Sequence, residues 1–178
     1  EVFEIASRHM APAEIRSSIQ KWIKDSRSGF LAEALENQGT SLTDLAQALT
    51  RFQHAALNDR ELSRSIQVDL RAALTRRFLT DQLQFVGVAK NYIEVSDFQE
   101  LTRRIICPDG SHGKVGGKSS GLFLAVQIVR KSEEYAEALK GIRIPKTWYV
   151  TSDGVINFIE HNHLEDLYDR KYLEIDQV

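Results

Sequence analysis

A glycine-rich stretch in the second half of the chain carries the residues best suited to chemistry. Residues 113–121 (GKVGGKSSG) hold four glycines, two lysines and two serines, and a helical pattern follows them. Glycines let backbone N–H groups converge on an anion without obstruction by side chains. The first turn of a helix adds free amides and the positive end of the helix dipole. Lys114 and Lys118 add full charges, so the stretch predicts a phosphate-binding loop.

Two known phosphate motifs do not account for this loop. Gly117, Lys118 and Ser119 match the end of the Walker pattern G-x-x-x-x-G-K-[ST], but His112 stands where the pattern requires its first glycine. No strong strand precedes the loop, and the dinucleotide pattern G-x-G-x-x-G also fails on spacing. A P-loop NTPase is therefore excluded. On motif form alone, a flexible turn before a capped helix is an equally good interpretation.

Other reactive side chains give weaker signals. His161 and His163 are two residues apart, so on a helix they point in nearly opposite directions and cannot chelate one ion. His112 lies beside the loop and could contact phosphate, although a turn residue is the simpler interpretation. Cys107 has no partner histidine at a recognisable spacing, which favours a buried structural thiol. We predict no catalytic residue and no metal ligand in this chain.

The first half of the chain is helical by its apolar spacing and its capping residues. Ser41 with Asp44 predicts a capped helix start, and Leu42, Leu45, Leu49, Phe52 and Ala56 form its apolar face. Trp22 and Trp148 are expected to anchor the core or an interface. The helices predicted here span residues 14–24, 30–37, 42–56, about 60–78 with Asp59 as the cap, 80–89, and a segment capped by Ser96 that includes Ile105 and Ile106.

The pattern changes after a turn-forming cluster at residues 107–113. A helix is predicted from Ser119 to Lys131, with Leu122, Val126 and Val129 on its buried side. A strand over residues 142–152 and a last helix capped by Ser152 or Asp153 follow. The fold class predicted is α+β and predominantly α-helical. It comprises an all-helical N-terminal region, residues 1–106, and a small α/β unit, residues 107–178.

Composition and net charge argue against two classes of protein, nucleic-acid binders and proteins that span a membrane. The chain has 178 residues, a formal net charge of −2 and one cysteine. The near balance of charge argues against a nucleic-acid binder, and no apolar run is long enough for a membrane span. A single cysteine cannot form an internal disulfide, which favours the cytoplasm. The chain begins at Glu1 and stops at Val178 within a helix-compatible stretch, so we expect a fragment of a longer protein.

Two segments together resemble a known family. The run V-G-G-K-S-S-G-L at residues 115–122 is followed by a helix, by I-R-I-P at residues 142–145, and by an apolar strand and a helix containing Phe158. This arrangement is similar to the start of the ATP-binding domain of the phosphoenolpyruvate synthase and pyruvate phosphate dikinase family. There the pattern is V-G-G-K-x-x-x-L, a helix, a V-P-P-G-F-x-x-T strand and another helix. The resemblance covers about a third of the chain and implies part of an ATP-grasp nucleotide-binding subdomain.

The resemblance assigns roles to the loop. It implies that Lys118 contacts the phosphates of ATP and that Gly116 and Gly117 lie against them. Ser119 is a candidate ligand for a different reason, because its hydroxyl can donate a hydrogen bond at the start of the helix. The second proline and the glycine of P-P-G-F are replaced here by Lys146 and Thr147. The family's arginines and carboxylates that hold the triphosphate and Mg²⁺, its phosphohistidine domain and its pyruvate-binding barrel lie further downstream. We therefore expect the chain alone to be inactive and to contribute to a phosphotransferase only within a longer protein.

A second hypothesis remains open at this stage. The chain could be a non-catalytic helical interaction module, in which the helices within residues 41–79 form a docking surface and the glycine-rich loop is a connector. Apolar faces left open by a partial domain could also be covered in a homodimer. The partners expected are ATP and, through the downstream domains, pyruvate; no nucleic acid and no membrane are expected.

Overall fold

The computed structural model describes residues 2–55, 59–133 and 136–166. Within these ranges the fold is predominantly helical with one small parallel sheet, which confirms the predicted α+β class. The elements are α1 (Val2–His9), α2 (Pro12–Glu36), α3 (Leu42–His54), a 3-10 turn (Asp59–Glu61), α4 (Arg64–Phe78), α5 (Leu83–Tyr92), α6 (Val95–Thr102), β1 (Ile105–Ile106), α7 (Gly117–Lys131), α8 (Ala136–Leu139), β2 (Tyr149–Val150) and α9 (Ser152–His161).

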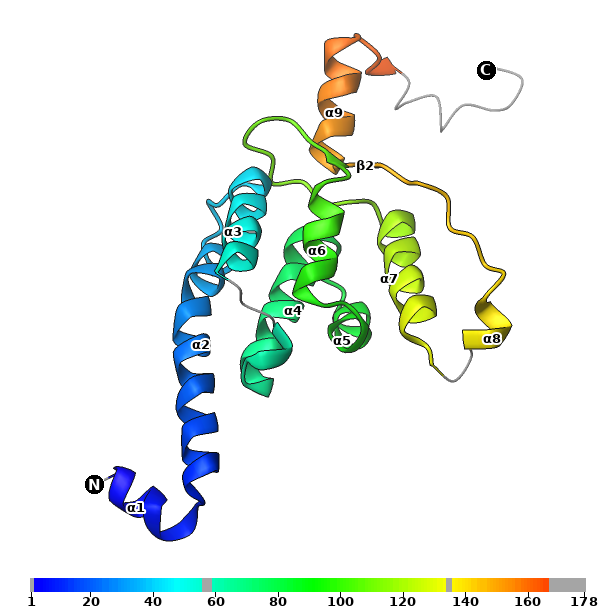
Figure 1. Cartoon of the computed structure of the whole chain (residues 1–178). Coiled ribbons are helices and arrows are strands. Elements are labelled where there is room, and N and C mark those ends of the chain that lie inside the picture. Colours follow the sequence, from blue (N-terminus) through cyan, green and yellow to red (C-terminus); the bar gives the residue numbers. More distant parts are fainter. Residues whose placement is uncertain (1, 56–58, 134–135, 167–178) are drawn as a thin grey trace.

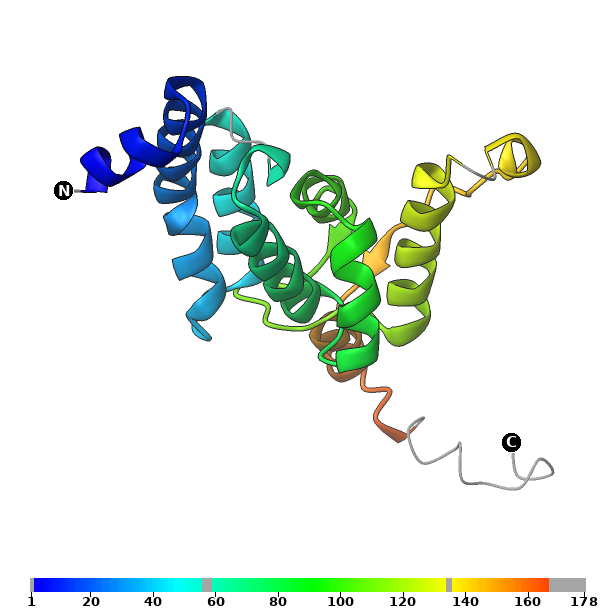
Figure 2. The ribbon, with the colours of Figure 1, turned by 90° about the horizontal axis from the view of Figure 1, so that it is seen from below.

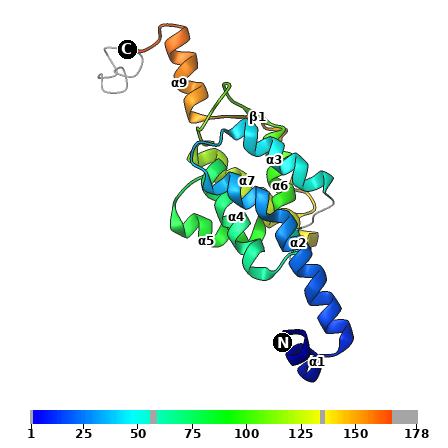
Figure 3. The same ribbon diagram turned by 90° about the vertical axis from the view of Figure 1, so that its left-hand side faces the viewer.

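The helices form a row that runs from α2 to α7 (Figure 1). The C-terminal half of α2 packs against α3 and α4 and buries Ser28, Leu31 and Leu35, while α4 contacts α5 and α6, and α5 contacts α7. The first turns of α2 extend away from this body and carry α1, as the view from below also shows (Figure 2). Helix α9 lies at the opposite end of the molecule from α1 (Figure 3). The middle of the row is therefore the packed part of the fold.

A chain of four aromatic rings runs through the core. The ring centroids are 5.9 Å apart for Phe78 and Phe98, 6.1 Å for Phe98 and Phe123, and 6.5 Å for Phe123 and Tyr149. These separations are typical of stabilising tilted and edge-to-face aromatic pairs. The rings belong to α4, α6, α7 and β2, so one core cluster includes residues on both sides of the boundary predicted after residue 106. The division into two domains remains a prediction.

Helix α3 forms as its sequence predicts. The hydroxyl of Ser41 accepts a hydrogen bond from the amide of Asp44 at 3.1 Å, and the Asp44 carboxylate accepts one from the amide of Ser41. This reciprocal cap satisfies two of the amides that a helix start leaves free. Leu45 and Leu49 are fully buried, which confirms the predicted apolar face. Ala56, the last residue of that face, lies outside the described residues.

Several predicted boundaries in the helical region are wrong. Residues 14–24 and 30–37 belong to one continuous helix, α2, because burial of Leu31 and Leu35 offsets the helix penalty of Gly29, about 1 kcal/mol. Ser63, not Asp59, stands at the N-cap of α4. Glu94, not Ser96, stands at the N-cap of α6, and α5 spans Leu83–Tyr92 instead of residues 80–89.

The predicted helix that includes Ile105 and Ile106 is also wrong, because these residues form β1. Ile105 pairs with Tyr149 and Ile106 with Val150 in a parallel register. Of the strand predicted over residues 142–152, only Tyr149–Val150 forms. Pro145 has no amide to donate, and the partner strand is only two residues long. The remainder of the segment is irregular.

Three apolar side chains are more exposed than a core position would allow. Trp22 and Trp148 are 59% and 54% exposed, so neither anchors the core, and their role at an interface remains a prediction. In α7, Val126 is buried as predicted, but Leu122 is 39% exposed, and Phe123 and Leu124 face the core in its place. The helix itself begins two residues earlier than predicted, at Gly117.

Candidate phosphate-binding loop

The glycine-rich loop lies beside the segment that joins β2 to α9. Val115 forms a bridge with Thr151, and the amide of Ser152 donates a hydrogen bond of 2.9 Å to the carbonyl oxygen of Lys114. The amide of Val115 also donates to the carbonyl oxygen of Phe78 at 3.0 Å, which fixes the loop to the end of α4. The loop and the end of the second resembling segment are therefore neighbours in space, although Val115 and Thr151 are 36 positions apart in the sequence.

Residues 111–113, at the start of the loop, already form hydrogen bonds with a carboxylate of the protein itself, that of Asp153. The Asp153 carboxylate accepts hydrogen bonds from the hydroxyl of Ser111 at 2.7 Å and from the amides of His112 and Gly113 at 3.1 and 3.0 Å. It also accepts one from the amide of Gly154 at 2.9 Å. These amides are occupied, so a phosphate cradle that uses Gly113 is not formed.

The pKa of Asp153 and the space around Gly113 are both consistent with this contact. Burial alone would raise the pKa of Asp153, but hydrogen bonds from Thr151, Ser111 and the amides of Gly113 and Gly154 outweigh that effect and lower the pKa to about 2. A Cβ atom at Gly113 would overlap the Asp153 carboxylate, so this position requires glycine for packing. Sequence analysis considered Asp153 only as a helix cap, since no local pattern pairs residues forty positions apart.

The predicted phosphate ligands lie together at the start of α7. Gly116 occupies the N-cap with φ −63° and ψ 161°, and its carbonyl oxygen accepts the first helical hydrogen bond, from Ser120. The amides of Gly117, Lys118 and Ser119 donate to no residue in the described part of the chain. Gly116, Gly117 and Lys118 are exposed, and a Cβ atom on either glycine would meet nothing within 4 Å. The start of α7 therefore exposes backbone amides that have no acceptor among the described residues.

The two lysines of the loop differ in their partners. Lys114 forms an ion pair with Asp81, which neutralises its charge. Lys118 is exposed, and no residue in the described ranges forms a hydrogen bond or an ion pair with it. The two serines differ in the same way, because Ser120 is buried and donates its hydroxyl to Gly116 at 3.2 Å whereas Ser119 is half-buried. Lys118, which the resemblance singled out, and Ser119, a candidate because of its hydroxyl, are therefore the lysine and the serine left available in the loop.

A basic cavity borders the loop. Arg76, Arg77, His112 and Lys114 line a cavity of about 630 Å³, together with Glu36, Asp81 and four other residues. Arg77 donates to the carbonyl oxygen of Thr40, and its buried Nε has no hydrogen-bond partner among the residues that the structure describes. No local sequence pattern predicts this cavity, because α4 and the loop are distant in sequence and come together only in the folded chain.

The remaining candidates have structural explanations. Cys107 is half-buried; burial raises the pKa of its thiol, and the carboxylates of Asp153 and Asp109 raise it further. A thiol in this environment is a poor nucleophile. His161 and His163 belong to no group of three or more metal-binding side chains within the residues that the structure describes.

Two further findings concern the chain as a whole. None of the helices in the described ranges combines the length and the apolar composition that a membrane span requires. Comparisons with protein-family models, with curated proteins and with solved structures give no match to this chain.

Proposed function

We propose that this chain contributes part of the ATP phosphate site of a phosphotransferase of the phosphoenolpyruvate synthase and pyruvate phosphate dikinase type. The proposal rests on the adjacency of two segments, the Gly-Gly-Lys start of α7 and the β2–α9 junction. In the sequence these segments carry the resemblance separately. In the structure Val115 pairs with Thr151 and Ser152 donates to Lys114, which is the proximity that one nucleotide site would require.

The start of α7 has the chemistry that a polyphosphate needs. Three free amides at Gly117, Lys118 and Ser119 and the positive end of a fifteen-residue helix attract an anion. Gly116 and Gly117 leave room for phosphate oxygens to approach the backbone. Lys118 adds a charge that no carboxylate in the described ranges neutralises. In a phosphotransferase this charge would stabilise the negative charge of the phosphates during transfer.

Mg²⁺ is not assigned to any residue of this chain. The described ranges contain no cluster of three or more carboxylate, histidine or cysteine side chains, so the residues present do not fit a metal site. No catalytic residue is assigned either, and transfer to a histidine carrier and to pyruvate would belong to further domains of a longer protein. A cytoplasmic location is part of the same proposal, since ATP-dependent phosphotransfer of this type uses the cytoplasmic nucleotide pool.

A lysine pair in the loop provides the test. We expect Lys118→Ala to weaken ATP binding about tenfold, because a charge-assisted hydrogen bond contributes about 1.5–3 kcal/mol. Lys114→Ala is the matched control, and we expect it to change the affinity less than twofold because Asp81 already pairs with Lys114. The dissociation constant for ATP would be measured by isothermal titration calorimetry for both variants and the unaltered chain. Equal affinities of the Lys118→Ala variant and the unaltered chain would contradict the proposal.

A second candidate function is a helical interaction module, but its docking surface is not the one expected. The apolar faces of α3 and α4 are buried in the core, so the surface expected at residues 41–79 is not open. Exposed apolar side chains are found instead on α1 and on the projecting half of α2, at Phe3, Ile5, Trp22 and Ile23 (Figure 1). A partner protein or a second copy of the chain would cover this surface. Sedimentation of the unaltered chain and of Trp22→Glu would distinguish a homodimer from a monomer.

A further inference from the structure

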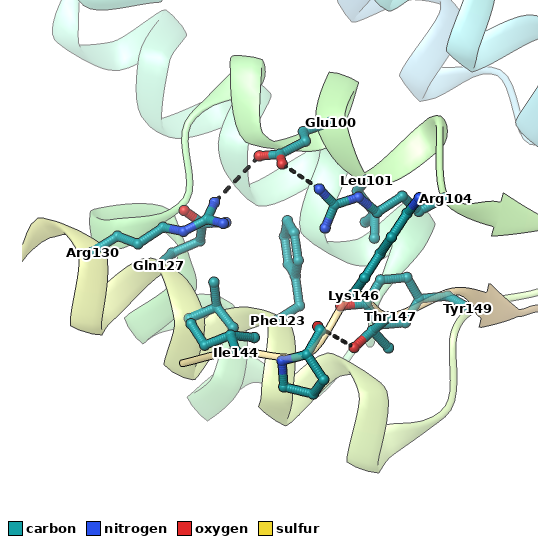
Figure 4. Close-up of a pocket in the computed structure, with 12 residues that line it drawn as sticks. Glu100, Leu101, Arg104, Phe123, Gln127, Arg130, Ile144, Lys146, Thr147 and Tyr149 are labelled. Carbon is teal, nitrogen blue, oxygen red and sulfur yellow. Dashed lines mark hydrogen bonds and ion pairs between the residues drawn. The ribbon is translucent and has the colours of Figure 1, made fainter. Parts of the chain in front are cut away.

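A second pocket lies between α6, α7 and the segment that leads into β2, away from the glycine-rich loop. It encloses about 200 Å³. Figure 4 shows Glu100 between Arg130 and Arg104, with Phe123 below it. The lining residues are Glu100, Leu101, Arg104, Phe123, Val126, Gln127, Arg130, Ile144, Pro145, Lys146, Thr147 and Tyr149.

The pocket is positively charged. Arg104 Nη2 lies 2.7 Å from one oxygen of Glu100, and Arg130 Nη1 lies 3.3 Å from the other, so two guanidinium groups share one carboxylate. Each guanidinium has five N–H donors, and in the described part of the chain each side chain uses only the bond to Glu100. Lys146 adds a third cation to the rim. Three cations and one carboxylate leave an excess of positive charge and many free donors, which favours an anionic ligand.

Two buried side chains of the pocket have polar groups without protein partners. Gln127 is 2% exposed and Tyr149 is 6% exposed, and neither side chain forms a hydrogen bond with any residue that the structure describes. Neither the Gln127 amide nor the Tyr149 hydroxyl is among the fully buried polar atoms without a partner, so within the described residues these groups keep contact with solvent inside the pocket. Burial raises the pKa of Tyr149, so its hydroxyl stays protonated and can donate. The Gln127 amide can donate and accept. Both groups are therefore suited to bind a ligand in the pocket.

The floor of the pocket sets the shape of that ligand. Phe123 and Ile144 lie below Glu100 in Figure 4 and give the pocket an apolar surface, and Pro145 also lines the pocket. A volume of about 200 Å³ holds roughly seven water molecules, at about 30 Å³ each, and is smaller than drug-sized ligand sites. A bare inorganic anion would leave the apolar side without contacts. We propose that this pocket binds a small organic carboxylate with a short apolar body, its carboxylate at Arg130 and Arg104 and its body against Phe123.

This site does not depend on the proposed ATP function, since it shares no residue with the start of α7. Benzoate is a suitable probe, because its ring and carboxylate match the two sides of the pocket, and benzamide is its neutral counterpart. In an NMR titration of the chain we expect benzoate to shift the amides of Gln127, Thr147 and Arg130 and to saturate. We expect benzamide to bind at least about tenfold more weakly.

Three variants complete the test. Arg130→Gln should weaken benzoate binding about tenfold or more, while Arg103→Gln, on the exposed side of the same region, should leave it unchanged. Gln127→Met should also weaken binding, and it should leave the melting temperature of the free chain nearly unchanged, because the amide forms no hydrogen bond with any described residue and the two side chains are similar in size. A merely structural Gln127 would instead lower that temperature when replaced.

The opposite results would overturn the proposal. Benzoate that causes no saturable shift in the pocket, or that binds Arg130→Gln as tightly as the unaltered chain, would contradict the site. Benzamide that binds as well as benzoate would show that charge is not recognised. Inorganic phosphate that displaces benzoate at equal concentration would contradict a ligand with an apolar body.

Discussion

The packed middle of the helix row and helix α9 differ in how completely they bury their apolar side chains. In α2, α3, α4 and α6, Leu31, Leu45, Leu49, Leu74 and Phe98 are fully buried. In contrast, α9 has no buried residue, and Val155, Ile156 and Phe158 are 44%, 45% and 61% exposed. The comparison indicates that the middle of the row provides most of the stability and that α9 contributes little to it.

The largest expected effect tests this difference in burial directly. Phe98→Ala should lower the free energy of unfolding by about 3–5 kcal/mol, because Phe98 is fully buried between Phe78 and Phe123. Phe158→Ala should change it by less than about 0.5 kcal/mol, since that ring is mostly exposed. Urea denaturation of the two variants measures both values. A loss at Phe158 comparable with the loss at Phe98 would show that α9 is part of the stable core.

Two glycines in the loop differ in their surroundings, since Gly113 is packed against Asp153 and Gly117 is open. Gly113→Ala should destabilise the chain by about 1–3 kcal/mol, because the new Cβ would overlap Asp153. Gly117→Ala meets no atom within 4 Å and lies in a helix, so it should raise stability by up to about 1 kcal/mol. Thermal unfolding compares the two variants. A destabilised Gly117→Ala variant would mean that the start of α7 is packed and not open.

The carboxylate of Asp153 predicts a pH dependence. Its pKa is about 2 in the folded chain and near 3.8 when unfolded, so its stabilisation is complete above about pH 5 and is lost as the pH falls from about 4 to 2. Asp153→Asn keeps the shape but removes the charge. At pH 7 we expect this variant to be less stable by about 1 kcal/mol, a value reduced for solvent screening. The difference should vanish near pH 2, and Asp109→Asn, at an exposed position, serves as the control. A constant difference across this pH range would contradict the account.

Local features of the fold could be predicted from sequence, and features that depend on distant pairs could not. The cap at Ser41 and the face of Leu45 and Leu49 follow from spacings of three and four residues, and the structure has them. Ile105 and Ile106 continue an apolar helical pattern, and only a partner strand forty-four positions away makes them a strand. Local energies favour neither state strongly for such short apolar runs.

The candidate sites could also be predicted only where their residues are close together in the sequence. The start of α7 is contiguous in sequence, so its glycines, Lys118 and Ser119 could be named in advance. The occupation of Gly113 by Asp153 and the sharing of Glu100 by Arg104 and Arg130 require the folded chain to bring α6, α7 and α9 to their positions. Sequence alone therefore names the candidate residues at the start of α7, but it does not reveal that Asp153 already accepts a hydrogen bond from Gly113.

The most direct test of the central claim is where ATP contacts the loop. In an NMR titration we expect ATP to shift the amides of residues 117–119 and to leave those of His112 and Gly113 nearly unchanged, because Asp153 already accepts hydrogen bonds from them. Lys118→Ala should abolish or strongly reduce the shifts. Shifts centred on residues 111–113, or no shift at the start of α7 at saturating ATP, would contradict the account.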